Sequence, residues 1–352
     1  MVAAADPAGG LFSSRHGRAL AFGCSFTACL LAAGALTITL LGRPGTSPSI
    51  RLELPQEASP HQPASSLRFS SNEAPVVGPV TKPLYAGKML LADPALIENS
   101  AKGPLPRIAD DGRKPMDVYA GAPGQGAKFK IAIVIHGLGR SSIATKTALD
   151  ALPAGVTLGF VPYAADVQDW VSKARERGHE ILLQVPMEPL DFPESDPGPQ
   201  TLRSGQEEES NIQRLSWAMS RFTGYAGVSN FLGQRLLTDA QALSPILTYL
   251  NRRGLYFFDN GAAGQSVVPL VAGQVGIASA QSGPALDSVQ DASEIDRRLS
   301  QLETEARANG TAAASAFLTP VTVARVAAWA KGLQARGFAL VPVSAIVAAP
   351  KP

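Results

Sequence analysis

Seven short runs of apolar, often β-branched residues recur over the last two thirds of the sequence, with helical stretches between them. The first, Ile131-Ala-Ile-Val-Ile135, has the uniform apolar character of a strand buried on both faces. Strand then helix, repeated over about 220 residues, predicts an α/β fold. We expect an irregular (β/α) barrel of about seven parallel strands, with an open doubly wound sheet as the alternative. The other six runs span 156–161, 181–185, 226–229, 255–259, 311–318 and 338–343.

One helix between these runs has a clear start. Asp291 and Glu294 have the spacing of an N-terminal capping box. A single apolar face follows them, with the 3.6-residue period of an amphipathic helix. Its members are Ile295, Leu299, Leu302 and Ala306.

The N-terminal region carries an apolar segment of membrane-spanning length. Residues 19–42 hold no charged side chain, and Arg15 and Arg18 precede them. A helix of this length crosses a hydrocarbon core, and the preceding arginines favour a cytoplasmic N-terminus. We therefore expect residues 1–18 in the cytoplasm, a single-pass signal anchor at 19–42 in a bacterial inner membrane, and the folded domain in the periplasm. A signal peptide cleaved near Ala33-Gly-Ala35 is the alternative.

The segment after the predicted anchor differs in composition. Residues 43–125 hold 13 of the 28 prolines and no sustained apolar period. This composition predicts an extended tether of little regular structure. Its last part, around Leu105 and Tyr119, has apolar residues that can contact the following domain. The folded domain is predicted over residues 126–348.

Charge and cysteine placement exclude several classes of function. A net charge of +2 without a long basic run argues against a nucleic-acid partner. Both cysteines, Cys24 and Cys29, lie in the first thirty residues, so no disulfide or cysteine-built zinc site is expected downstream. The predicted domain holds two histidines, His136 and His179, and His179 precedes its strand rather than following it.

Polar residues gather where the predicted strands end. Because loops at the carboxyl ends of parallel strands face one cavity, their side chains are the candidate ligand-binding residues. These candidates are His136 after the first run, Gln184 and Glu188 in and after the third, Asn230 and Arg235 after the fourth, and Asp259 and Asn260 at the fifth. An architectural role at the strand ends is the competing interpretation for Asn230, Arg235 and Asp259.

Two familiar chemistries do not fit these strand ends. His136-Gly-Leu-Gly139 looks like an oxyanion loop, but the chain has no Gly-x-Ser-x-Gly and no histidine after His179. A dinucleotide-binding loop lacks its third glycine, because Ser142 stands there.

A zinc site usually needs three or four His, Cys or carboxylate ligands. Only His136 with Glu188 and Asp259 offers a carboxylate-rich set.

Several short motifs follow one another in a recognisable order. The most specific are Gly178-His-Glu180 and Pro186-Met-Glu-Pro189, supported by Ile131-Ala-Ile-Val-Ile135, Gly254-Leu-Tyr-Phe-Phe-Asp259 and Leu340-Val-Pro-Val-Ser344. As an ordered set, from about residue 131 to 347, they resemble the divergent polysaccharide deacetylase family, a branch of the NodB-type carbohydrate esterases. The family implies a distorted (β/α) barrel and metal-assisted removal of acetyl groups from a glycan.

The chain departs from that family where the chemistry is expected. Family members with the full pattern carry an Asp-Asp pair after the first strand, and this chain has His136-Gly137 there. Such members also carry a metal-binding histidine where this chain has Phe231. A late segment with two histidines reads Ala316-Phe-Leu-Thr-Pro320. We therefore expect no resident cofactor, no catalytic residue of the usual kind and no metal.

Three hypotheses follow. The first is a catalytically degenerate protein that binds a glycan, a peptidoglycan-related ligand or an envelope protein. The second is an active hydrolase that deacetylates a polysaccharide through a rearranged, divalent-metal site, with His136, Glu188 and Asp259 as its catalytic residues. The third is a tethered scaffold whose cleft is unused.

Overall fold

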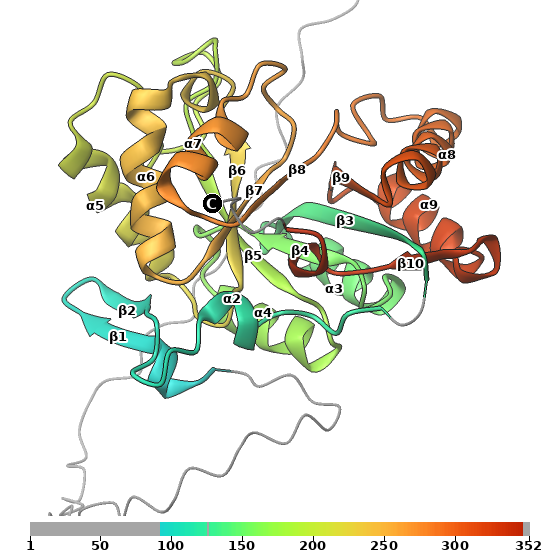
Figure 1. Ribbon diagram of the computed structural model, residues 1–352, viewed down its shortest axis with the longest axis horizontal. Coiled ribbons are helices and arrows are strands. Elements are labelled where there is room, and N and C mark those ends of the chain that lie inside the picture. Colours follow the sequence, from blue (N-terminus) through green and yellow to red (C-terminus); the bar gives the residue numbers. More distant parts are fainter. Residues whose placement is uncertain (1–91, 125–126, 348–352) are drawn as a thin grey trace, which may run out of the picture. The chain divides into compact units, whose positions relative to one another are not determined.

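A parallel barrel dominates the computed structural model, which describes residues 92–124 and 127–347. Eight described strands form one sheet, and seven of them curve into a nearly closed barrel with helices outside it (Figure 1), which confirms the predicted fold class. The barrel strands are β3 (Phe129–Leu138), β4 (Thr157–Phe160), β5 (Ile181–Met187), β6 (Gly227–Leu232), β7 (Tyr256–Asp259), β8 (Ser279–Gln281) and β9 (Thr311–Phe317).

The helices that follow the strands cover the outside of the barrel, with α5 to α7 on one side and α8 and α9 on the other (Figure 1). At α8, the Asp291 side chain accepts bonds from the Ser293 and Glu294 amides, and the four predicted apolar residues are buried, so this helix is confirmed. The helices are α3 (Ser142–Ala151), α4 (Val167–Glu176), α5 (Glu208–Met219), α6 (Ala240–Arg252), α7 (Val268–Val275), α8 (Ala292–Asn309) and α9 (Pro320–Lys331).

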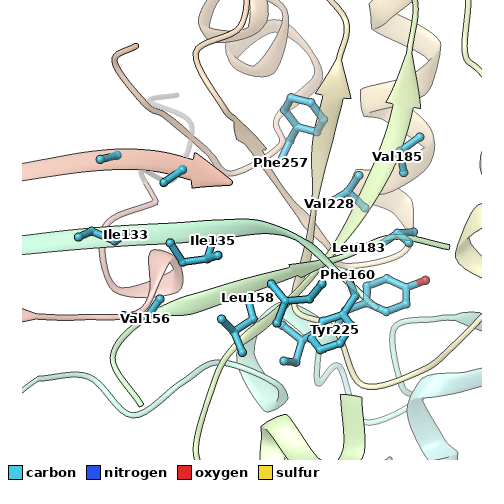
Figure 2. Packing of buried hydrophobic residues seen from close by; sticks show 14 of the residues in the cluster. Ile133, Ile135, Val156, Leu158, Phe160, Leu183, Val185, Tyr225, Val228 and Phe257 are labelled. Carbon is cyan, nitrogen blue, oxygen red and sulfur yellow. The ribbon is translucent and has the colours of Figure 1, made fainter. Parts of the chain in front are cut away.

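Alternation along the strands divides the apolar core in two. Ile133 and Ile135 of β3 belong to the cluster that packs under the helices, and Figure 2 shows them with other members of that cluster, such as Leu183 of β5. Ala132 and Val134 belong to a second cluster, together with Leu182 of β5. Since successive side chains in a strand point to opposite faces, this second cluster fills the barrel interior.

The strand list differs from the prediction at two places. β8 was missed because Ser279-Ala-Gln281 is only partly buried and has no apolar run. The predicted strand at 338–343 is the short β10 (Phe338–Leu340), which pairs with the start of β3, on the edge where β4 pairs further along. β10 therefore extends the sheet rather than completing the barrel.

The barrel is left open between β8 and β9, which share no ladder among the described strands. Side chains close this seam. The Ser282 hydroxyl accepts a bond from the Ser315 amide at 2.9 Å, and the Ser315 hydroxyl donates to the Asn260 carbonyl at 2.6 Å. Hydroxyl groups thus satisfy backbone groups that a missing strand pair would leave unbonded.

Residues 92–124 are folded, where the sequence predicted a tether of little structure. They form the hairpin β1 (Ile97–Ser100) and β2 (Gly103–Pro106) and the helix α2 (Pro115–Val118). Leu105 packs in the helix-side core and Tyr119 in the interior core, and both are buried. The apolar residues noted there outweigh the local proline content, because they cover the amino-terminal end of the barrel.

The remaining N-terminal predictions lie outside the described residues. These are the cytoplasmic segment 1–18, the membrane anchor 19–42 and the first part of the tether, 43–91. Within 92–124 and 127–347, no helix is both long and apolar enough to cross a bilayer.

Candidate functional site

The strand register determines which candidate side chains face the barrel interior. Paired residues in a parallel ladder project to the same face of the sheet. His136 pairs with Phe317 of β9, and Gln184 pairs with Ser229 of β6. Phe231 pairs with Pro186 two residues further along. These side chains share the interior face at the carboxyl ends of the strands.

A cavity of about 300 Å³ opens at this end of the barrel. Its wall is mainly aromatic and proline side chains, and its polar members are Gln184, Arg140 and Asp196, the last two exposed. Small-molecule sites commonly combine an apolar wall with a few polar groups in this way. The lining consists of Gly137, Arg140, Val161, Pro162, Tyr163, Gln184, Pro186, Asp196, Pro197, Phe231 and Phe317.

His136 lies buried between aromatic rings. Its ring centroid is 6.3 Å from that of Phe258 and 6.4 Å from that of Phe317. A side chain at Gly159 would come within 2.7 Å of His136 Nδ1, so that glycine makes room for the imidazole. Burial lowers the pKa of His136 to about 3, because the charged form would lose its hydration. The imidazole is therefore neutral near pH 7 and a poor proton acceptor.

Gln184 reaches from β5 to the end of β3. Its Oε1 accepts a bond from the Gly137 amide at 3.0 Å. Its Nε2 has no hydrogen-bond partner among the described residues, although the side chain is only 1% exposed. Gln184 also lines the cavity, so this buried, unused donor lies beside the cavity.

Glu188 and Arg235 lie beside the cavity but do not line it. The Glu188 carboxylate accepts a bond from the Ser204 amide at 2.7 Å, and Arg235 Nη1 is 3.9 Å from its other oxygen. The Glu188 carbonyl also accepts a bond from the Arg235 amide. Glu188 thus ties together the two segments that follow β5 and β6.

Asn230, Asp259 and Asn260 lie at the ends of β6 and β7, where Asn230 and Asn260 are hydrogen-bonded to each other. Asn230 and Asp259 pair with Val185 and Gln281, whereas their neighbours Ser229 and Phe258 pair with each other on the interior face. The register thus turns both side chains toward the helices. Asn260 donates its amide to Asn230 Oδ1 at 2.9 Å and accepts a bond from Asn230 Nδ2 at 2.7 Å.

The Asp259 carboxylate has different partners. It accepts bonds from the Gly261 amide and from Gln281 Nε2, each at 3.0 Å. Burial raises the pKa of this carboxyl above its ordinary value. Both of its oxygens are used by neighbouring segments, so it supports the strand end.

The structure thus brings together two of the seven candidates, His136 and Gln184, and places the other five around them. It adds Ser229 to the interior, and Tyr163, Arg140 and Asp196 to the cavity wall. Tyr163 and Arg140 follow the first two predicted strands closely, so strand-end position was a usable signal for them. Asp196 lies in the long segment after β5, where no pattern indicated a contact with the cavity.

The divalent metal implied by the family resemblance does not fit these side chains. His136 is the one imidazole in this group, and Phe258 and Phe317 flank it where further donors would be needed. Within the described ranges, no group of three or more His, Cys, Asp or Glu side chains is placed to hold a metal ion. His179 lies at the other end of β5, with Nδ1 2.9 Å from the Val156 carbonyl.

Two uncharacterized proteins are similar in sequence to this chain. An uncharacterized protein of Haemophilus influenzae is 26% identical over 207 residues, covering 59% of this chain and 73% of its own. The uncharacterized protein YibQ of Escherichia coli is 25% identical over 194 residues, covering 55% of this chain and 60% of its own.

This chain is also similar to a solved structure and matches a known protein family. The crystal structure of an uncharacterized Agrobacterium tumefaciens protein superposes with a TM-score of 0.68 and 38% identity, covering 70% of this chain and 100% of its own. Residues 133–347 match the family described as divergent polysaccharide deacetylase. Since this match covers more than half of the sequence, the chain belongs to the divergent polysaccharide deacetylase family.

Proposed function

We propose that this protein binds an envelope glycan in the cavity at the carboxyl ends of its barrel strands, and that it does not act as a metal-dependent deacetylase. One observation carries the proposal. Two phenylalanines, Phe231 and Phe317, line a cavity together with Gln184, whose amide donor is unused. Aromatic faces pack against the apolar faces of sugar rings, and a few polar groups orient the ring.

Exposed apolar residues support the same end of the barrel as the binding face. The large apolar side chains that are exposed in the described residues lie at the carboxyl end of a strand or in the segment that follows it. A ligand longer than the cavity would cover part of this surface. They are Ile143, Tyr163, Leu190, Leu270, Val289 and Phe317.

Substitution of the cavity phenylalanines tests the proposal. The full chain is titrated with cellulose, xylan, chitin and peptidoglycan oligosaccharides in a calorimeter. We expect Phe231→Ala and Phe317→Ala each to weaken the best ligand at least tenfold, about 1.4 kcal/mol, because a stacking surface is lost. Glu305→Ala, at an exposed residue of α8 outside the cavity lining and the apolar surface around it, is the control. Absence of binding, or binding that both substitutions leave unchanged, would refute the proposal.

The alternative is an active hydrolase that uses His136, Glu188 and Asp259. It receives less support, because Asp259 faces the helices and Glu188 is bonded to Ser204 and lies near Arg235. Turnover of an acetylated oligosaccharide that His136→Ala abolishes would favour this alternative. The scaffold hypothesis instead requires cavity substitutions to leave the cellular phenotype unchanged.

We also propose that residues 19–42 anchor the protein in the inner membrane, with the barrel in the periplasm. The support is the absence of charge over a span of membrane-crossing length that follows two arginines. Protease added to spheroplasts should degrade the barrel while the protein remains with carbonate-washed membranes. A barrel protected from protease, or released by the wash, would contradict this placement.

A further inference from the structure

Unpaired polar atoms are concentrated below the cavity. Of nine buried side-chain nitrogen and oxygen atoms without a partner among the described residues, four belong to three interior residues. They are both ring nitrogens of His136, Nε2 of Gln184 and Oγ of Ser229. A buried polar group left unbonded costs about 1–3 kcal/mol. Such a concentration in one place indicates that a bound group completes these bonds.

The three residues are neighbours. Gln184 and Ser229 are paired across β5 and β6, and Gln184 also bonds to Gly137, the residue after His136. Phe258, the partner of Ser229 on β7, stacks on the His136 ring with an interplanar angle of 23°. We call His136, Gln184 and Ser229 the floor of the cavity: Gln184 lines the cavity, and His136 and Ser229 are its buried neighbours outside the lining.

The floor has no charged side chain to neutralise an ion. The charged residues of the cavity lining, Arg140 and Asp196, are exposed. A buried ion without a counter-charge is strongly disfavoured. Burial also lowers the pKa of His136, so the imidazole itself remains neutral. An uncharged group is therefore the one that this floor accepts.

The donors and acceptors of the floor define that group further. Gln184 Nε2 only donates, so the bound group must include an acceptor. Ser229 Oγ and a neutral imidazole each offer one donor and one acceptor function. A hydroxyl group complements this set, since it donates one bond and accepts two. To reach the floor, the hydroxyl must project from a sugar ring that stays at Phe231 and Phe317.

We propose that the floor of the cavity binds the hydroxymethyl group of a hexose unit, bonded to Gln184 and Ser229 beside His136. This inference rests on the proposed glycan binding and adds the class of sugar. Sugars that lack the hydroxymethyl group leave the floor unbonded. Sugars that carry a carboxylate there place a charge in it.

Three β-1,4-linked oligosaccharides of equal length test this: those of glucose, xylose and glucuronic acid, which carry hydroxymethyl, hydrogen and carboxylate at the same ring position. We expect the full chain to bind the glucose oligosaccharide at least tenfold more tightly than either of the others. Gln184→Met keeps the side-chain length and removes the donor, so it should abolish most of this preference. Gln265→Met, at an exposed residue outside the cavity lining, should preserve it.

The outcomes separate this inference from the proposed function. Binding of all three sugars that depends on Phe231 but shows no preference for glucose would overturn the floor assignment alone. Ordered water alone on Gln184 and Ser229, in a crystal of the glucose complex, would overturn it as well. Failure of all three sugars, and of chitin and peptidoglycan oligosaccharides, to bind would refute glycan binding at this cavity. Ser229→Ala removes one hydroxyl and provides a second variant if Gln184→Met does not fold; an unchanged preference in Ser229→Ala would count against the inference.

Discussion

At the scale of single residues, the interior of the barrel holds a neutral group near one end and a carboxylate at the other. His136 lies among rings near the carboxyl ends of the strands. Glu180, just before β5, is fully buried at the amino-terminal ends and accepts bonds from Tyr256, Gly121 and Ser344. The unbonded imidazole is suited to meet a ligand, whereas the bonded carboxylate is suited to hold the chain together.

His136 should make the fold sensitive to acid. Its pKa is about 3 in the folded protein and near 6.5 in the unfolded chain, so below pH 6.5 the unfolded chain binds the extra proton. The contribution of the neutral His136 to the free energy of unfolding is therefore complete above pH 6.5. It decreases as the pH falls toward 3, by up to about 1.4 kcal/mol per pH unit. We expect His136→Gln to reduce this slope in urea unfolding between about pH 7 and about pH 4.5. If the free energy of unfolding depended on pH equally in both proteins, His136 would not have a lowered pKa.

At the scale of elements, Glu180 joins three segments that are distant in the sequence. Its carboxylate bonds to Gly121 after α2 at 2.9 Å, to Tyr256 of β7 at 2.7 Å and to Ser344 near the C-terminus at 3.0 Å. All three donors are buried or partly buried. Removing the shared acceptor leaves each of them unbonded, and a buried donor without a partner is costly.

Glu180→Ala should therefore lower the free energy of unfolding by about 3 kcal/mol or more. Tyr256→Phe removes only one of the bonds and should cost about 1 kcal/mol, which makes it the matched comparison. Denaturant unfolding measures both. If the two variants lost the same stability, Glu180 would not act as the shared acceptor described here.

The strands also show how far the sequence could predict the fold. β3 was predictable because an apolar run of its length is typical of a strand covered on both faces. β8 was not, because its central Ala280 is flanked by Ser279 and Gln281, and its position depends on pairing with β7. The same limit applies to the site. Ser229 and Asn230 are adjacent, yet only Ser229 faces the interior, and that choice depends on the register between β5 and β6.

At the scale of the whole described fold, the two ends of the barrel have different tasks. The carboxyl ends of the strands carry the cavity and the exposed apolar side chains. The amino-terminal ends are covered by residues 92–124, which bury Leu96, Leu105 and Tyr119 against the barrel. Composition alone assigned these residues to a tether, because proline content is a local property and burial is not. The folded unit accordingly starts before residue 126.

This difference predicts how truncated chains behave. A chain that begins at residue 92 should unfold in a single cooperative transition. A chain that begins at residue 127 loses the buried side chains of Leu96, Leu105 and Tyr119, worth on the order of 5 kcal/mol together. It also leaves Glu180 without its bond to Gly121. Because small domains have a net stability of roughly 5–15 kcal/mol, the shorter chain should unfold at much lower urea or fail to fold.

Point substitutions separate the loss of packing from the effect of cutting the chain. Tyr119→Ala in the longer chain should lower the free energy of unfolding by about 3 kcal/mol, since it opens a cavity in the interior core. Lys102→Ala, at an exposed residue in the turn between β1 and β2, is the control and should change the stability by less than about 0.5 kcal/mol. Equal urea midpoints for the chains that begin at 92 and at 127 would mean that the barrel needs no cover. Residues 92–124 would then pack on the barrel without stabilising it.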